Sequence, residues 1–256
     1  MERFSIINRE DADSKAVTLK IKTELINGGL SYDETSPQLV ICVGGDGTLL
    51  YAVHQYIDLL DKVYFVALHT GTLGFYTDYT RDQIDELIHD ILNDHHAYIY
   101  SPKLLEVKIK NQTFYALNEI RIENILRTQT FDIYVDGEFF ERFKGNGMCL
   151  STQAGSTAYN RSLKGAVIDA GVSLMQLVEI AGIHDHQHRT MGVPYIMRDD
   201  RAVKFKGNFA NASLCYDYLY TRLDGVDEIN CKMSYRKVRF IRYHEYSYLE
   251  RLRNLY

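Results

Sequence analysis

The feature that most constrains the fold is a change in the spacing of apolar residues near residue 103. After that point apolar residues recur with period two, and Asp136-Gly137 separates two such runs in the manner of a hairpin turn. Before it, short apolar runs alternate with helix-like stretches, a pattern that predicts βα units and a parallel sheet. These stretches and runs are Phe4–Asn8, Val17–Ile26, Leu39–Val43, Leu49–Leu60, Val63–His69 and Gln83–Leu92.

We therefore predict an α/β N-terminal domain with a parallel sheet over residues 1–100 and a mainly antiparallel β-sandwich C-terminal domain over residues 101–243. Residues 244–256 carry a short amphipathic pattern and are a candidate to pack back on the first domain. A helix-like segment, Val172–Ile183, is expected to interrupt the second domain. Its later strands are predicted at Arg201–Phe209, Ala212–Leu223 and Lys237–Tyr243.

Composition excludes several classes of protein. The chain has 256 residues with a net charge of −5, which offers no argument for nucleic acid as a partner. It contains neither an apolar run long enough to span a membrane nor a signal-peptide pattern, so we expect a cytoplasmic protein without a membrane partner. Its four cysteines lie far apart and read as reduced, mostly buried thiols.

The most informative motif is a glycine-rich turn after the apolar run Leu39–Val43. Gly44, Gly45, Gly47 and Thr48 lie where a strand would pass into a helix, so that backbone N–H groups and the helix N-terminus can hold a phosphate. The turn is neither a Walker A loop nor the dinucleotide fingerprint, whose third glycine is replaced by Leu50. The alternative is a purely structural role, a tight turn in which Asp46 caps the helix.

Three further motifs follow in order: His69-Thr70-Gly71-Thr72-Leu73-Gly74-Phe75, Asn118-Glu119 and Gly155-Ser156-Thr157-Ala158-Tyr159-Asn160. Together with Gly-Gly-Asp-Gly-Thr, they resemble the NAD kinase family over nearly the whole chain. Further matches, such as Phe140-Glu141-Arg142-Phe143, resemble the short forms from Gram-positive bacteria. Diacylglycerol and sphingosine kinases share the glycine loop but should lack the other motifs.

The resemblance implies ATP-dependent phosphorylation of the adenosine 2′-hydroxyl of NAD, with Mg²⁺ arriving with ATP and no dedicated metal ligands. Asp46 is then the catalytic carboxylate, Gly44, Gly45, Gly47 and Thr48 hold phosphates, and the second domain binds substrate. It also implies a homotetramer or dimer with sites completed across an interface. The residues implied to bind substrate are Asp46, Gly47, Phe75, Asn118, Glu119, Lys144, Asn146, Ser156, Thr157, Ala158, Tyr159, Asn160, Arg161, Ser162, Ala181 and Tyr218.

The sequence departs from the family pattern around the substrate. Asn146 stands where a carboxylate is usual, Gln153 replaces a proline, Lys164 replaces a glycine, and Tyr218 lies where histidine is frequent. A carboxylate can make a charge-assisted hydrogen bond that an amide cannot. From the sequence we therefore expect Asn146→Asp to tighten NAD binding several-fold.

Three alternatives stay open at this stage. One is a lipid kinase sharing the glycine loop, and another is a non-catalytic nucleotide-binding protein, for which the altered positions are the only support. The third concerns His184-Asp185-His186-Gln187-His188, whose alternating imidazoles invite a metal. We read that segment as a solvated loop, because zinc ligands normally need a fixed element and a supporting shell.

Overall fold

The computed structural model describes residues 1–256 except 72–73, 94–97, 187–188, 246 and 254–256. The chain divides into two compact units. Unit 1 comprises Met1–Pro102 with Arg236–Tyr256, and unit 2 comprises Lys103–Tyr235. No helix in the described part of the chain is long and apolar enough to cross a membrane.

Unit 1 is built on a sheet whose described strands follow the order β2-β1-β3-β4-β17-β5. All neighbouring pairs are parallel except β17 with β5. The parallel part confirms the α/β class predicted for the N-terminal region. The strands are β1 (Arg3–Asn8), β2 (Ser31–Tyr32), β3 (Leu39–Val43), β4 (Tyr64–Leu68), β5 (Tyr98–Tyr100) and β17 (Phe240–Arg242).

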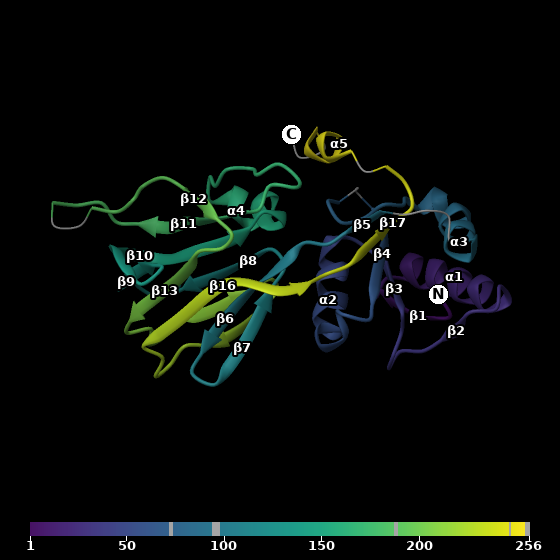
Figure 1. The fold of residues 1–256 in the computed structure, drawn as a ribbon, viewed down its shortest axis with the longest axis horizontal. Coiled ribbons are helices and arrows are strands. Elements are labelled where there is room, and N and C mark those ends of the chain that lie inside the picture. The colour runs from purple at the N-terminus through teal and green to yellow at the C-terminus, as the bar shows by residue number, and fades with distance from the viewer. Residues whose placement is uncertain (72–73, 94–97, 187–188, 246, 254–256) are drawn as a thin grey trace. The chain divides into compact units, whose positions relative to one another are not determined.

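Helices cover both faces of this sheet (Figure 1). α1 (Ala12–Asn27) and α3 (Ile84–Asn93) share one apolar cluster with alternate residues of β1, β3 and β4. α2 (Asp46–Gln55) lies on the opposite face, where Ser5 of β1 and Tyr56 hydrogen bond at 2.9 Å. The remaining helical elements are α5 (Tyr248–Arg253) and two short 3₁₀ turns, Ile57–Leu59 and Arg81–Gln83.

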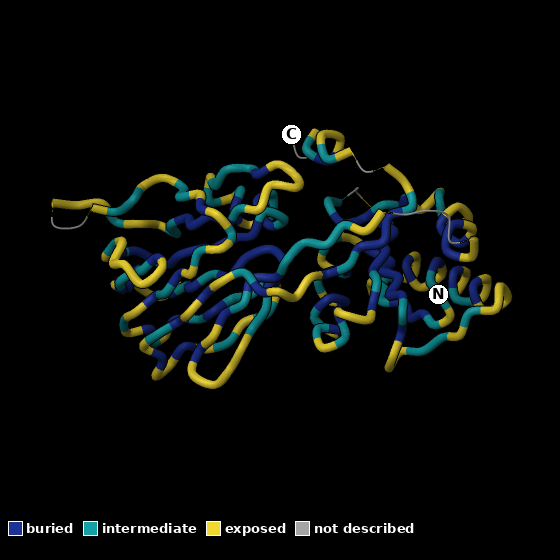
Figure 2. The backbone as a smooth tube through the Cα atoms, in the orientation of Figure 1, coloured by how far each residue is buried: buried dark blue, intermediate teal, exposed yellow. Residues whose placement is uncertain are grey.

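Unit 2 is a large sheet in which every neighbouring pair with a determined register is antiparallel. Its described strands follow the order β15-β14-β8-β10-β9-β13-β16-β6-β7, with β11 pairing to β10 and β12 to β11. Inward-facing residues of these strands form one apolar core (Figure 2). The strands are β6 (Lys103–Ile109), β7 (Gln112–Ala116), β8 (Glu119–Glu123), β9 (Gln129–Val135), β10 (Glu138–Thr152), β11 (Leu174–Gly182), β12 (Tyr195–Arg198), β13 (Ala202–Gly207), β14 (Ser213–Tyr216), β15 (Leu219–Arg222) and β16 (Glu228–Lys237).

The predicted hairpin at Asp136-Gly137 is confirmed. β9 ends at Val135 and β10 begins at Glu138, and both turn residues have positive φ, 52° and 86°. These values are those of a type I′ turn, whose twist matches that of the flanking strands. Two helical pieces complete unit 2: a 3₁₀ turn, Ala154–Thr157, and α4 (Tyr159–Ser162).

The expected helix over Val172–Ile183 is wrong, because β11 occupies Leu174–Gly182. Four consecutive residues of this strand, Met175 to Val178, are buried. A strand covered on both faces has no alternation to reveal it, so its apolar run cannot be told from a buried helix. The strand expected at Lys237–Tyr243 forms as β17, but in the sheet of unit 1.

Candidate active site

The glycine-rich turn joins β3 to α2, as the sequence predicts. Val43 ends the strand, Gly45 is the N-cap and Asp46 begins the helix. A Cβ on Gly44 would collide with the side chain of Thr48, so internal packing requires that glycine. No atom lies within 4 Å of a Cβ built on Gly45 or Gly47. At these two positions the fold itself does not demand glycine.

Asp46 does not cap its own helix, which has no side-chain cap hydrogen bond. Its carboxylate instead accepts hydrogen bonds from the loop after β4: the N–H of Phe75 donates to Oδ2 at 2.9 Å, and the N–H of Tyr76 donates to Oδ1 at 3.0 Å. Gly74 permits this arrangement, because a Cβ there would lie 2.6 Å from Cγ and 2.7 Å from Oδ2 of Asp46. Two backbone donors thus fix the carboxylate in one orientation.

The loop that holds Asp46 is itself braced within unit 1. Thr77 Oγ1 accepts a hydrogen bond from the Gly74 N–H at 3.1 Å, and Arg251 of α5 donates to the Gly74 carbonyl at 3.0 Å. The Phe75 ring meets the ring of Tyr248, also in α5, edge to face at 6.0 Å. Thr72 and Leu73 of the same motif lie outside the described residues.

In unit 2, Asn118 and Glu119 lie at the start of β8 and are both buried. Asp217 fixes the backbone before them, since its carboxylate accepts hydrogen bonds from the N–H groups of Leu117 and Asn118, each at 2.8 Å. Burial, followed by the nearby charge of Asp217, raises the pKa of Glu119 to about 8. The Glu119 carboxyl is therefore largely protonated at neutral pH.

The segment from Gly155 to Ser162 packs against this pair. A Cβ on Gly155 would collide with the Asn118 carbonyl, and the backbone N–H of Tyr159 donates to a carboxyl oxygen of Glu119. Buried hydrogen bonds shape the segment: Ser156 Oγ accepts from the Ile168 N–H at 3.0 Å, and Asn160 Nδ2 donates to the Ser156 carbonyl at 3.0 Å. Thr157, Ala158, Arg161 and Ser162 lie on the same short stretch.

The Tyr159 ring is half-exposed, and the guanidinium of Arg121 lies over it at 4.0 Å. Arg121 in turn donates to Glu123 at 2.9 Å. Because alternate residues of a strand share a face, Glu119, Arg121 and Glu123 project from the same side of β8. A flat ring with a cation on one face is an aromatic platform suited to stacking a planar group.

Three other predicted site residues lie on β10 and β11. Lys144 Nζ is 3.6 Å from Asp185, and Ala181 is exposed with a positive φ of 48°. Asn146 is engaged within the protein, since its Nδ2 donates to the Asn124 carbonyl at 2.9 Å. A carboxylate at position 146 could not donate this bond.

The other altered positions lie in turns and loops of unit 2. Gln153 donates to the Ile168 carbonyl at 3.1 Å, and Lys164 has a φ of 65°, a conformation that favours the glycine it replaces. Tyr218 is 47% exposed at the turn between β14 and β15. His184 and His186 are exposed, as expected of a solvated loop, whereas Gln187 and His188 lie outside the described residues.

Sequence reasoning missed three residues that shape these groups of side chains. Arg121 could have been found only with a strand predicted from Glu119 onward, because the two residues then share a face of that strand. Asp217 was visible only as the neighbour of Tyr218, and it acts on a backbone 99 and 100 residues away in sequence. Arg251 lies 177 residues from Gly74 and carries no local motif.

Comparison with known proteins covers both units. Family models described as the ATP-NAD kinase N-terminal and C-terminal domains match residues 7–96 and 117–243. The chain is 38% identical over 258 residues to an NAD kinase from Geobacillus stearothermophilus, covering 98% of this chain and 95% of that protein. It is 36% identical to NAD kinase 1 of Bacillus subtilis (strain 168), with 98% and 97% covered.

Solved structures share the fold. A yeast NADH kinase complexed with NADH superposes with a TM-score of 0.85 at 19% identity, covering 99% of this chain and 86% of that one. An NAD kinase from Archaeoglobus fulgidus in complex with ATP gives a TM-score of 0.78 at 21% identity, with 99% and 96% covered. With the glycine loop, its carboxylate and the matches across nearly the whole length, this chain belongs to the NAD kinase family.

Proposed function

We propose that this NAD kinase transfers the γ-phosphate of Mg²⁺-bound ATP to the adenosine 2′-hydroxyl of NAD, with Asp46 as the residue that orients that hydroxyl and takes its proton. The observation that carries the assignment is the Asp46 carboxylate, held by the N–H groups of Phe75 and Tyr76 at the end of a glycine-rich turn. The relatives named as NAD kinases and the solved neighbour holding ATP support the choice of substrates.

The reaction needs positioning and charge stabilisation more than covalent chemistry. The 2′-oxygen attacks the γ-phosphorus, the bond to the β-phosphate oxygen breaks, ADP leaves, and the hydroxyl proton passes to Asp46. Asp46 already has a fixed orientation, so little reorganisation is needed when substrate binds. The N–H groups at the start of α2, beside Gly45 and Gly47, supply donors for phosphate oxygens, while Mg²⁺ enters as part of the ATP substrate.

We assign recognition of the adenosine ribose to Asn118 and Glu119 in unit 2. Asp217 fixes the backbone at this position, so the two side chains extend from a rigid part of the chain. A protonated Glu119 can donate one hydrogen bond and accept others, and the Asn118 amide can do both as well. Ribose hydroxyls need partners of this mixed kind. Tyr159, backed by Arg121, provides the surface for a planar group.

Two coarser properties complete the proposal. We place the protein in the cytoplasm, supported by its four cysteines, which are free and mostly buried thiols as in a reducing compartment. We also propose a homotetramer or dimer, as the family resemblance implies. Cell fractionation and sedimentation velocity test the two statements separately, and a monomer at micromolar concentration would refute the second.

The decisive experiment incubates the purified protein with ATP, Mg²⁺ and NAD and measures NADP with a coupled dehydrogenase. We expect NADP formation in the wild type and a roughly 10²-fold or greater loss of kcat in Asp46→Asn, which keeps the shape of the side chain but cannot take a proton. Phosphorylation of diacylglycerol without phosphorylation of NAD would support the lipid-kinase alternative instead. Unchanged turnover in Asp46→Asn would remove this residue from the mechanism.

A further inference from the structure

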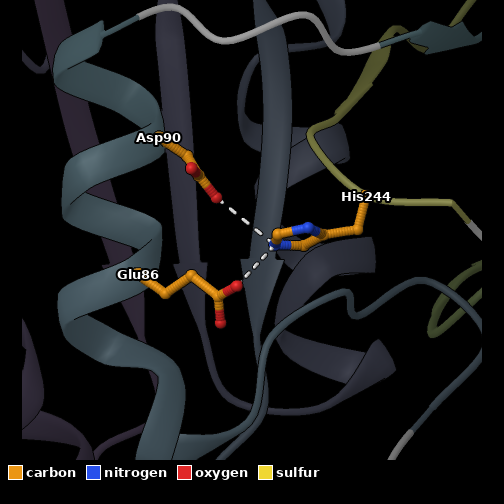
Figure 3. A group of neighbouring side chains, drawn as sticks. All are labelled: Glu86, Asp90 and His244. Carbon is orange, nitrogen blue, oxygen red and sulfur yellow. Dashed lines mark ion pairs between the residues drawn. The ribbon is translucent and has the colours of Figure 1, made fainter.

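Outside the groups described above, unit 1 brings together Glu86, Asp90 and His244 (Figure 3). The two acidic residues lie one turn apart on α3, and both point toward the imidazole of His244, which follows β17. His244 Nε2 is 3.5 Å from Glu86 Oε1 and 3.3 Å from Asp90 Oδ2. One atom from each residue lies within 4.8 Å of the other two.

These distances fit a metal site. With bonds of about 2.0–2.1 Å, the ligands of a tetrahedral zinc ion are separated by about 3.3–3.4 Å. His244 Nε2 lies close to that separation from both carboxylate oxygens, at 3.5 and 3.3 Å, and the two oxygens lie within 4.8 Å of each other. One nitrogen and two oxygens are a set that zinc accepts, and they leave the fourth position to water.

The surroundings of the three ligands add a second, independent argument. Tyr79, a fully buried residue, donates its hydroxyl hydrogen to Asp90 Oδ2 at 2.8 Å, and its ring meets the His244 imidazole edge to face at 5.0 Å. Metal-bound carboxylates are commonly oriented by such an outer hydrogen bond. Gln83 likewise donates to the other oxygen of Glu86 at 3.0 Å.

Charge balance points the same way. Asp90 is only 8% exposed, and no lysine or arginine in the described part of the chain forms a salt bridge with Asp90 or Glu86. Among the described residues, the basic side chains within salt-bridge distance of the two carboxylates are histidines. Two carboxylates lie together here, one of them on a buried residue, and a divalent ion bound between them would balance their charge.

We propose that Glu86, Asp90 and His244 form a binding site for a divalent transition-metal ion, with zinc as the best fit. The site is separate from the Mg²⁺ that accompanies ATP. It joins α3 to the segment between β17 and α5, the helix whose Arg251 contacts Gly74. A bound ion would therefore hold the segment that leads from β17 to α5 against α3.

The test uses the full chain without an affinity tag, stripped of metal by a chelator and titrated with Zn²⁺ against a chromophoric competitor. We expect one tight site per chain. His244→Gln should weaken it by at least about 100-fold, and Tyr79→Phe, which removes only the outer hydrogen bond, by about 10–100-fold. Glu86→Gln removes a second ligand at an exposed helix position, where an amide of equal size leaves folding unchanged.

The matched control is the double variant His184→Gln/His186→Gln, which removes two of the three imidazoles of the segment from His184 to His188, both of them exposed. The proposal expects this variant to bind Zn²⁺ as the wild type does, and Zn²⁺ to raise the melting temperature of both but not of His244→Gln. Equal Zn²⁺ affinity in wild type, His244→Gln and Glu86→Gln would overturn it. So would loss of the tight site in the double variant alone.

Discussion

Replacing Gly74 by alanine tests whether the orientation of Asp46 matters for turnover. The new methyl carbon would lie 2.6 Å from Cγ and 2.7 Å from Oδ2 of Asp46. Ordinary carbon–oxygen contacts are about 3.3–3.6 Å, so the carboxylate must move by roughly 1 Å. That shift breaks hydrogen bonds of 2.9 and 3.0 Å to Phe75 and Tyr76. A misplacement of this size in a reacting group costs about 10²-fold in rate.

The assay is steady-state NADP formation, with kcat and both KM values measured for each variant. We expect Gly74→Ala to lose kcat by about 10²-fold with little change in the KM for NAD, since the reacting geometry is lost and not ground-state binding. Gly71→Ala is the matched control, because it adds the same methyl group to the same loop with no atom within 4 Å. Full turnover in Gly74→Ala, or equal losses in the two variants, would refute the reasoning.

Three further predictions concern the remaining residues. Gly47→Ala should keep or raise the melting temperature, because alanine favours helix by about 1 kcal/mol over glycine and its methyl group meets no atom within 4 Å. The same variant should raise the KM for ATP, because the methyl group would keep phosphate from approaching this backbone. An unchanged KM would remove Gly47 from the phosphate site. Glu119 has a folded-state pKa of about 8 against an ordinary 4.5, so the folded state retains a proton that the unfolded state releases. The contribution of Glu119 to the free energy of unfolding should therefore be fully present below pH 4.5 and be lost as the pH rises to about 8. In urea unfolding measured across this pH range, Glu119→Gln should lack that decrease, and identical pH dependence in the two proteins would contradict the assignment. Asn146→Asp should lose the hydrogen bond to the Asn124 carbonyl, lower the free energy of unfolding by about 1–3 kcal/mol and raise the KM for NAD. A lower KM would instead support the expectation from sequence that aspartate tightens NAD binding.

Sequence reasoning succeeded on the fold where local patterns carry the information. The change in apolar period predicted both sheet types, and Asp136-Gly137 located a hairpin because the turn is encoded by its own two residues. It failed at Leu174–Gly182, where burial on both faces removes alternation. It also could not assign β17 to a sheet, because Phe240 pairs with Phe65 and Tyr100, which are far away in sequence.

The candidate site divides in the same way. Asp46 and Glu119 were candidates from sequence because each lies in a short motif that resembles those of the NAD kinase family. The groups that orient them could not be: the donors to Asp46 lie 29 and 30 residues further along the chain, and Arg251 lies much further. The metal ligands Glu86 and His244 are likewise brought together only by the fold. A motif identifies which chemistry is possible, whereas the three-dimensional contacts decide how it is oriented.

Asn146 shows why a departure from a family pattern is hard to interpret from sequence. When this position is compared with the family pattern, the amide looks like the loss of a carboxylate that binds substrate. In the structure the Asn146 side chain donates to the backbone carbonyl of Asn124. The backbone carbonyl of Asn146 accepts from the Asn124 N–H at 2.8 Å and from Gln129 Nε2 at 2.9 Å. Two of these bonds tie β10 to Asn124, in the segment between β8 and β9, and the third ties it to Gln129 at the start of β9. An aspartate would keep the two bonds to the carbonyl but place a charge that cannot donate beside the Asn124 oxygen. The amide is therefore explained by its contacts within this chain, because the bond it donates to the Asn124 backbone carbonyl is one that no aspartate can make, whatever residue occupies position 124.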